Sequence, residues 1–230
     1  MLNMIKLDWL GMKCYHKRFV IIPLFILPYG LLHEVVIIPF MAYMMLSFSV
    51  NPFAVEEKGK LDNLYLTLPV TRKNIVTARF GLSLIMQFAG LVLGTVIALI
   101  YNALLYGRTV LYVFTHTFKA DFDAIFLIIC SSLLFYAIMN LSTFPILFKV
   151  GYAKGKLFGF IIPIVAASVI AGIFVTLFNA NIDFGGWVYS VIEWVFANTV
   201  WTAAIILGAA VLILTGSYAL SQRLYAGREF

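Results

Sequence analysis

Residues 56–79, EEKGKLDNLYLTLPVTRKNIVTAR, form an island of charge in a chain that is otherwise almost continuously apolar. The island carries five Lys or Arg residues, and the apolar stretches on both sides of it are long enough to enter a membrane. It must therefore lie in one of the two flanking aqueous phases. Because an excess of Lys and Arg marks cytoplasmic loops, we expect the island to lie in the cytoplasm.

The composition indicates an all-α integral membrane protein. Of the 230 residues, 63% are hydrophobic and 11% are charged, and the mean hydropathy is +1.01, whereas soluble domains are about a quarter charged. A span needs about 20 apolar residues, so the chain holds about six spans in a single transmembrane domain over 1–230. The net charge of +6 follows from the topology, and we expect no nucleic-acid partner.

The distribution of Lys and Arg sets the predicted topology. The long apolar stretch 19–54 is read as two spans turned back as a hairpin, because a single span would place the island opposite the basic N-terminal segment. With both termini in the cytoplasm, fourteen of the sixteen Lys and Arg residues fall on the cytoplasmic side. This topology predicts a multi-pass protein of the cytoplasmic membrane. The predicted spans are 19–33, 35–54, 80–106, 124–148, 157–178 and 200–220.

Two further segments have the pattern of helices at the membrane surface. Residues 1–18 place Leu2, Ile5 and Trp9 at helical spacing, which predicts an interfacial amphipathic helix. The aromatic segment before the last span, with Trp187 and Trp194, predicts an outer helix that dips into the membrane. An aromatic belt followed by a simple loop explains it equally well.

The short motifs that suggest an enzyme fail on their spacing. His33-Glu34 begins like the zinc motif HExxH, but Ile37 stands where the second histidine belongs. Residues 151–157, GYAKGKL, resemble a phosphate loop, but one residue is missing between the glycines and Leu157 replaces the Ser or Thr. We therefore expect no catalytic residue, metal or cofactor in this chain.

A few small or polar residues lie inside the predicted spans. Gly90 and Gly94 make a smooth stripe that lets helices approach closely, and Asn140 can bond between helices or line a path. These three residues are candidates for packing at a dimer interface or along a path. No Asp, Glu, Lys or Arg lies deep in a predicted span, which argues against an ion-coupled carrier.

The island itself has helix signals. Leu61, Leu64 and Leu68 recur at helical spacing among charged residues, Pro69 stops that helix, and Thr71 is placed to cap a new helix that runs into the third span. This arrangement predicts a stiff break between two helices at the membrane surface. An ordinary solvated loop anchored by its positive charge is the alternative.

The island also resembles a known motif. Its acidic pair before Lys58-Gly59, its spaced leucines, Leu68-Pro69-Val70, Thr71-Arg72 and the final Arg79 are similar to the segment between the second and third spans of bacterial type-2 ABC exporter permeases. The resemblance implies a permease subunit that pairs with a second copy or a sister permease. It also implies a separate ATPase subunit, which binds ATP and magnesium and docks on a coupling helix within 55–79, with a smaller contact at 149–156. The implied ATPase interface consists of Glu56, Glu57, Lys58, Leu61, Leu64, Tyr65, Leu68, Pro69, Arg72 and Lys154.

The expected function is therefore that of a membrane subunit of an ATP-driven exporter in a bacterial membrane. The apolar and aromatic spans favour hydrophobic or amphipathic cargo, such as a peptide, an antimicrobial or a lipid-like molecule. The alternative is a membrane scaffold or sensor that transports nothing and uses the island to recruit a cytoplasmic partner.

Overall fold

The computed structural model describes residues 2–11, 37–59, 71–105, 122–155 and 184–227, with isolated helical residues between 157 and 176. Every regular element within these ranges is an α-helix, as the composition predicts. Four helical stretches of this part are long and apolar enough to cross a membrane, namely Ile37–Gly59, Arg72–Tyr101, Phe122–Val150 and Thr199–Ala226. They correspond to four of the predicted spans. The predicted span 19–33 and most of 157–178 lie outside the described residues.

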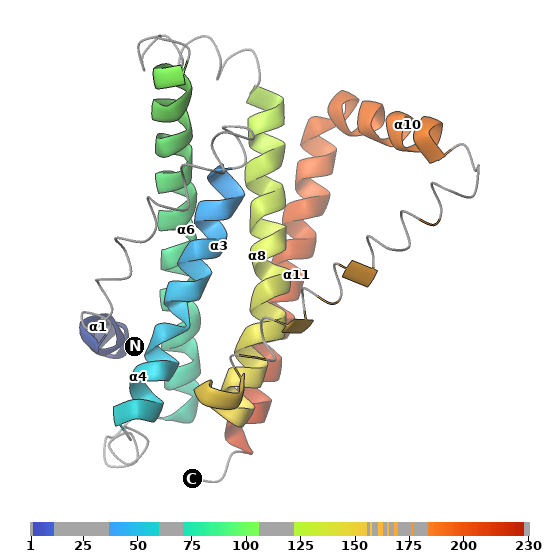
Figure 1. Cartoon of the computed structure of the whole chain (residues 1–230). Helices are drawn as coiled ribbons and strands as arrows, with labels where there is room; N and C mark the ends of the chain where they lie inside the picture. The colour runs from blue at the N-terminus through green and yellow to red at the C-terminus, as the bar shows by residue number, and fades with distance from the viewer. Residues whose placement is uncertain are drawn as a thin grey trace.

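The four long stretches lie side by side as a bundle (Figure 1). Helix α3 (Ile37–Ser49) continues into α4 (Asn51–Gly59) and packs against α6 (Arg72–Leu105) and α8 (Phe122–Val150). Helix α11 (Thr199–Ala226) packs along α8 and also touches α6. We call the end of the bundle that holds α4, the start of α6 and the end of α11 the α4 end (Figure 1).

Local chemistry sets the helix boundaries at this end. Pro52 has no N–H to continue the hydrogen-bond ladder of α3, but it fits the first turn of a new helix, so α3 stops at Ser49 and α4 starts at Asn51. Helix α6 begins at Arg72, eight positions before the predicted span. Its cap is Thr71, whose Oγ1 accepts a hydrogen bond from the backbone N–H of Asn74 at 3.3 Å. The cap predicted from the sequence is confirmed.

Helices α3 and α6 approach closely because α6 carries glycine at the contact. A Cβ atom at Gly94 would lie 3.0 Å from the Cα of Ile38, and one at Gly90 would lie 3.1 Å from the Cα of Ala42. The stripe expected from these two glycines thus faces α3 of the same chain. Any role of the two glycines in a dimer or in a path stays a prediction.

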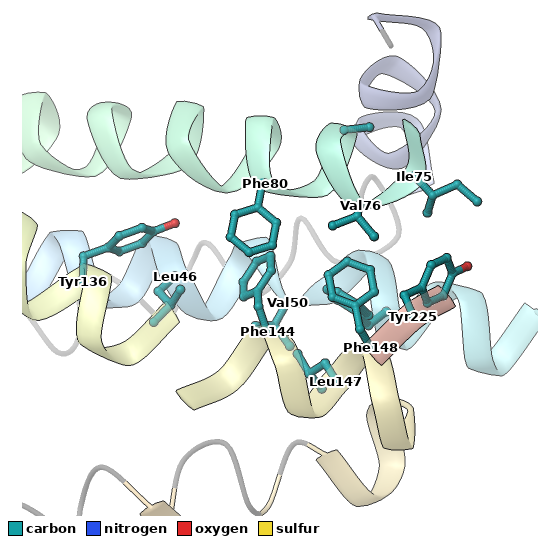
Figure 2. Close-up of a cluster of buried hydrophobic side chains, with 12 residues drawn as sticks. Leu46, Val50, Ile75, Val76, Phe80, Tyr136, Phe144, Leu147, Phe148 and Tyr225 are labelled. Atoms are coloured by element: carbon teal, nitrogen blue, oxygen red, sulfur yellow. The ribbon is translucent and has the colours of Figure 1, made fainter. Parts of the chain in front are cut away.

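Aromatic rings fill the bundle near the α4 end (Figure 2). The ring of Phe144 on α8 lies edge-on to Phe80 on α6 at a centroid distance of 5.0 Å, and Phe148 packs edge-on against Tyr225 of α11 at 5.3 Å. Such pairs add to the free energy gained from burying the rings. This aromatic cluster joins α6, α8 and α11.

Two shorter helices lie at opposite ends of the bundle. Helix α1 (Leu2–Gly11) rests on α4 and α6 through Ile5, while Trp9 and Leu10 are exposed. Helix α10 (Phe184–Ala197) leaves the bundle at the far end (Figure 1). Its exposed Trp187, Tyr189 and Trp194 are residue types that settle at the level of lipid headgroups.

Candidate functional site

The α4 end exposes a charged surface built from two segments that are far apart in the sequence. The carboxylate of Glu57, in the last turn of α4, accepts a hydrogen bond of 2.8 Å from the backbone N–H of Ala153. This bond holds the two segments of the predicted ATPase interface, 55–79 and 149–156, against each other. We call this surface the charged face, and its exposed members are Glu57, Lys58, Arg72, Lys73 and Lys154.

A glycine turn brings Ala153 into this position. Gly151 follows the last residue of α8 with a φ of 85°, and its N–H bonds the carbonyl of Leu147 at 3.0 Å. This left-handed conformation is a common end for a helix, and glycine adopts it without steric cost. The chain then turns back at once, so the helical turn of residues 152–155 lies beside α4.

The start of α6 is fixed to the end of α11 at the same face. The Nη1 atom of Arg72 donates hydrogen bonds to the carbonyl of Ala226 at 2.8 Å and to that of Tyr225 at 3.5 Å. Carbonyl groups at the end of a helix lack partners in the helix and carry partial negative charge, so a guanidinium satisfies both needs. Arg72 therefore joins two helices that are separated by about 150 positions in the sequence.

Behind the charged face lies a group of three buried charges, which we call the buried charge cluster. Arg79 of α6 is 1% exposed, and Glu56 of α4 and Asp8 of α1 are each 4% exposed. The Nη2 atom of Arg79 lies 2.6 Å from Glu56 Oε2, and its Nε atom lies 4.0 Å from Asp8 Oδ2. The guanidinium also sits over the ring of Phe53 at 4.2 Å, an arrangement that is favourable for a cation.

The burial of Glu56 corrects one expectation from the sequence. Glu56 was predicted on the surface that meets the ATPase, but its side chain points into the bundle and pairs with Arg79. The reason is helical spacing, because Glu56 lies three positions after the buried Phe53 and so shares its face. Its neighbour Glu57 is the carboxylate that faces outward.

Asp8 was missed in the sequence, although a signal for the cluster was present. Arg79 follows Ile75 by four positions and Val76 by three, so all three share the apolar face of α6, and all three are buried. A charged residue on the inner face of a span requires a buried partner. The sequence alone does not say that the second carboxylate comes from α1.

Comparison with known proteins identifies the family of this chain. The family model described as "ABC-2 family transporter protein" matches residues 3–226, nearly the whole chain. The chain belongs to the ABC-2 transporter family. No curated protein and no solved structure matches this ABC-2 type permease. The family suggests an ABC transporter permease that works with an ABC ATPase.

Inside the bundle of the permease, polar side chains link three spans. Asn140 of α8 donates from Nδ2 to the hydroxyl of Ser83 on α6 at 3.1 Å, and its Oδ1 accepts from the hydroxyl of Ser217 on α11 at 3.1 Å. The hydroxyl of Tyr136 donates to the carbonyl of Ser83 at 2.8 Å. In an apolar surrounding such bonds hold helices in register. Asn140 thus bonds between helices, and its role in a path stays a prediction.

The rest of the predicted interface is not open to structural description. Five residues of the expected ATPase interface lie outside the described residues. They are Leu61, Leu64, Tyr65, Leu68 and Pro69.

We predict that the stability of the permease depends on pH through Asp8. Burial raises the pKa of Asp8 above its ordinary 3.8, and the attraction of Arg79 offsets only part of this. Above pH 3.8, the folded chain therefore keeps a proton that the unfolded chain releases, so the free energy of unfolding falls as pH rises toward the raised pKa. Thermal unfolding in detergent, from about pH 4 to about pH 8, checks this.

The matched variant for this measurement is Asp8→Asn, which cannot titrate. The Tm of Asp8→Asn minus the Tm of the unmodified chain should increase as pH rises, because the variant lacks the cost of ionising a buried carboxyl. A Tm of the unmodified chain that rises relative to Asp8→Asn with pH would contradict the prediction. It would mean that the attraction between the Asp8 carboxylate and Arg79 outweighs burial.

Proposed function

We propose that this ABC-2 type permease is the membrane subunit of an ATP-driven exporter and that its ATPase subunit docks on the charged face. The observation that carries the proposal is the bond between Glu57 and Ala153. The family resemblance implied that both segments touch the ATPase, and they lie together as one surface. A single partner can therefore contact both at once.

The expected topology belongs to this proposal. Six spans with both termini in the cytoplasm put the charged face in the cytoplasm, where an ATPase has access to ATP and magnesium. The Lys and Arg residues of the charged face agree with the rule for cytoplasmic segments. The proposal also includes a bacterial membrane and a complex that contains two permease subunits.

The cargo is proposed from the character of the spans. In the described parts of the four long helical stretches, charged residues lie only near the helix ends, and the central turns are apolar apart from amides, hydroxyls and one thiol. A path between such helices offers few charged groups for an ion or a sugar phosphate. Hydrophobic or amphipathic cargo, such as a peptide or a lipid-like molecule, fits better. Export is the direction that we propose.

The proposal predicts that charge and apolar contacts on the island hold the ATPase. We expect Leu64→Asp and Leu68→Asp each to weaken the complex with the ATPase at least about tenfold, because a buried apolar contact at the centre of an interface carries much of its affinity. The double variant Lys58→Glu/Lys154→Glu tests the charged face itself. It should lower the association rate constant by a larger factor than it raises the dissociation rate constant. Co-purification and surface binding kinetics measure these effects.

The control is Asp123→Lys at the far end of the bundle, where the residue is exposed. This variant should bind the ATPase as the unmodified chain does. A complex that both leucine variants and the double variant leave intact would contradict the docking proposal. Capture of a cytoplasmic protein without ATPase activity, in place of the ATPase, would favour the scaffold or sensor instead.

A further inference from the structure

The guanidinium of Arg79 lies against side chains of three other helices. It meets Asp8 of α1, Glu56 and Phe53 of α4, and lies 5.8 Å from the ring of Phe148 on α8. Arg79 itself belongs to α6. One side chain thus joins α1, α4, α6 and α8 at a single point directly behind the charged face.

Such a cluster is a costly way to stabilise a fold. Removing charges from water costs several kcal/mol per ion, and apolar residues of similar size often replace a buried ion pair with no loss of stability. The surrounding residues Phe53, Phe148 and Val76 already form an apolar core. What charges add to such a core is selectivity for a partner, because the attraction between opposite charges favours Glu56 and Asp8 as the neighbours of Arg79, whereas apolar contacts can slide.

We propose that Arg79 is a positioning residue for coupling, one that makes α1 and the end of α4 move as a single unit when the ATPase moves the charged face. This inference rests on the proposed function. Glu56 and Glu57 are adjacent on α4, and their side chains point in directions about 100° apart. Glu57 accepts a hydrogen bond from the N–H of Ala153 on the outer surface, and Glu56 forms an ion pair with Arg79 inside. A displacement of the charged face therefore reaches Arg79 through a single turn of helix.

The role of α1 follows from its contacts. Its inner side is held by Ile5 in the core and by Asp8 facing Arg79, while Trp9 and Leu10 are exposed on the other side, where they suit the membrane interface. Within the described residues, the contact of Asp8 with Arg79 is the one ion pair that joins α1 to the bundle. If Arg79 fixes α1 to α4, a movement of α4 also moves α1 within the membrane surface.

The experiment measures movement of α1 and of α4 separately in the complex of permease and ATPase. A spin label replaces either Lys6 on α1, which is exposed, or Val55 on α4, which is half-buried and does not belong to the charged face. The background carries Cys14→Ser and Cys130→Ala. The distance between the same label in the two permease copies is measured without nucleotide and with a non-hydrolysable ATP analogue and magnesium. In the otherwise unmodified chain we expect both distances to shift.

Two variants separate positioning from folding. In Asp8→Asn/Glu56→Gln/Arg79→Met no charge is left in the buried charge cluster, so we expect the chain to keep its fold. We expect the Val55 shift to persist and the Lys6 shift to fall about fivefold or more. Arg79→Lys keeps the positive charge and should restore most of the Lys6 shift. A side chain that only filled space would not distinguish lysine from methionine in this way.

The outcomes separate the two proposals. A Val55 label that does not shift with nucleotide in the complex would contradict the proposed function. A Val55 label that shifts while Lys6 does not, or a Lys6 shift that survives in the uncharged variant, would overturn the role of Arg79 and leave the proposed function standing.

Discussion

Arg79→Met is expected to lower the free energy of unfolding by about 3–5 kcal/mol, because it leaves a buried carboxylate without its counter-ion. Glu56 is 4% exposed and its Oε2 atom lies 2.6 Å from the guanidinium that the substitution removes. Domains are stable by only about 5–15 kcal/mol, so the loss removes a large share of the total. Thermal unfolding in detergent, followed by tryptophan fluorescence, measures it.

Two comparisons give this experiment its controls. Arg72→Met removes the same kind of side chain from the same helix at an exposed position, where it bonds carbonyls of α11, and it should cost about 1 kcal/mol. The uncharged variant Asp8→Asn/Glu56→Gln/Arg79→Met should recover most of the stability that Arg79→Met loses. If the uncharged variant were as unstable as Arg79→Met, the loss would come from packing of the side chain and not from unpaired charge.

Gly94→Ala is expected to destabilise the permease by about 1–3 kcal/mol, although alanine is the better helix former. The new Cβ atom would lie 3.0 Å from the Cα of Ile38 and 3.2 Å from its carbonyl oxygen. Both atoms belong to the backbone of α3, so no side chain can rotate away and the two helices must separate. The Tm in detergent and the yield of folded protein by size-exclusion chromatography report the change.

The matched control is Gly208→Ala, the same substitution in another span. A Cβ atom at Gly208 of α11 meets nothing within 4 Å, so this variant should gain up to about 1 kcal/mol from helix propensity. The two substitutions thus have opposite expected signs. If Gly94→Ala raised the Tm as much as Gly208→Ala does, α3 and α6 would not be in close contact at Gly94.

Much of the fold could be predicted from patterns within single segments. Four of the predicted spans have helical counterparts because about 20 consecutive apolar residues can satisfy their backbone in lipid only as a helix. The start of α6 was predicted from Thr71 because capping depends on residues within one turn. The helix break at Pro52 also depends only on nearby residues. The separate helix α4 that results from it was not expected.

The candidate site was predicted only in part. The sequence singled out the island, and Glu57, Lys58, Arg72 and Lys154 of the expected interface are exposed on the charged face. Their contact with an ATPase stays a prediction. The sequence placed Glu56 on the same surface, and this was wrong. Neighbouring carboxylates on a helix point about 100° apart, and which of the two faces inward depends on where the other helices lie.

By itself, the sequence determined that the chain is an all-α membrane protein of the ABC-2 type, because apolar length, charge distribution and the island motif are properties of the chain read in order. Only the tertiary structure decided which distant residues meet. The contact of Asp8 and Glu56 with Arg79, the bond of Glu57 to Ala153 and the contact of Gly94 with Ile38 each join separate helices. Such contacts depend on how helices pack and rotate against each other, and the spacing of residues along one helix does not contain that information.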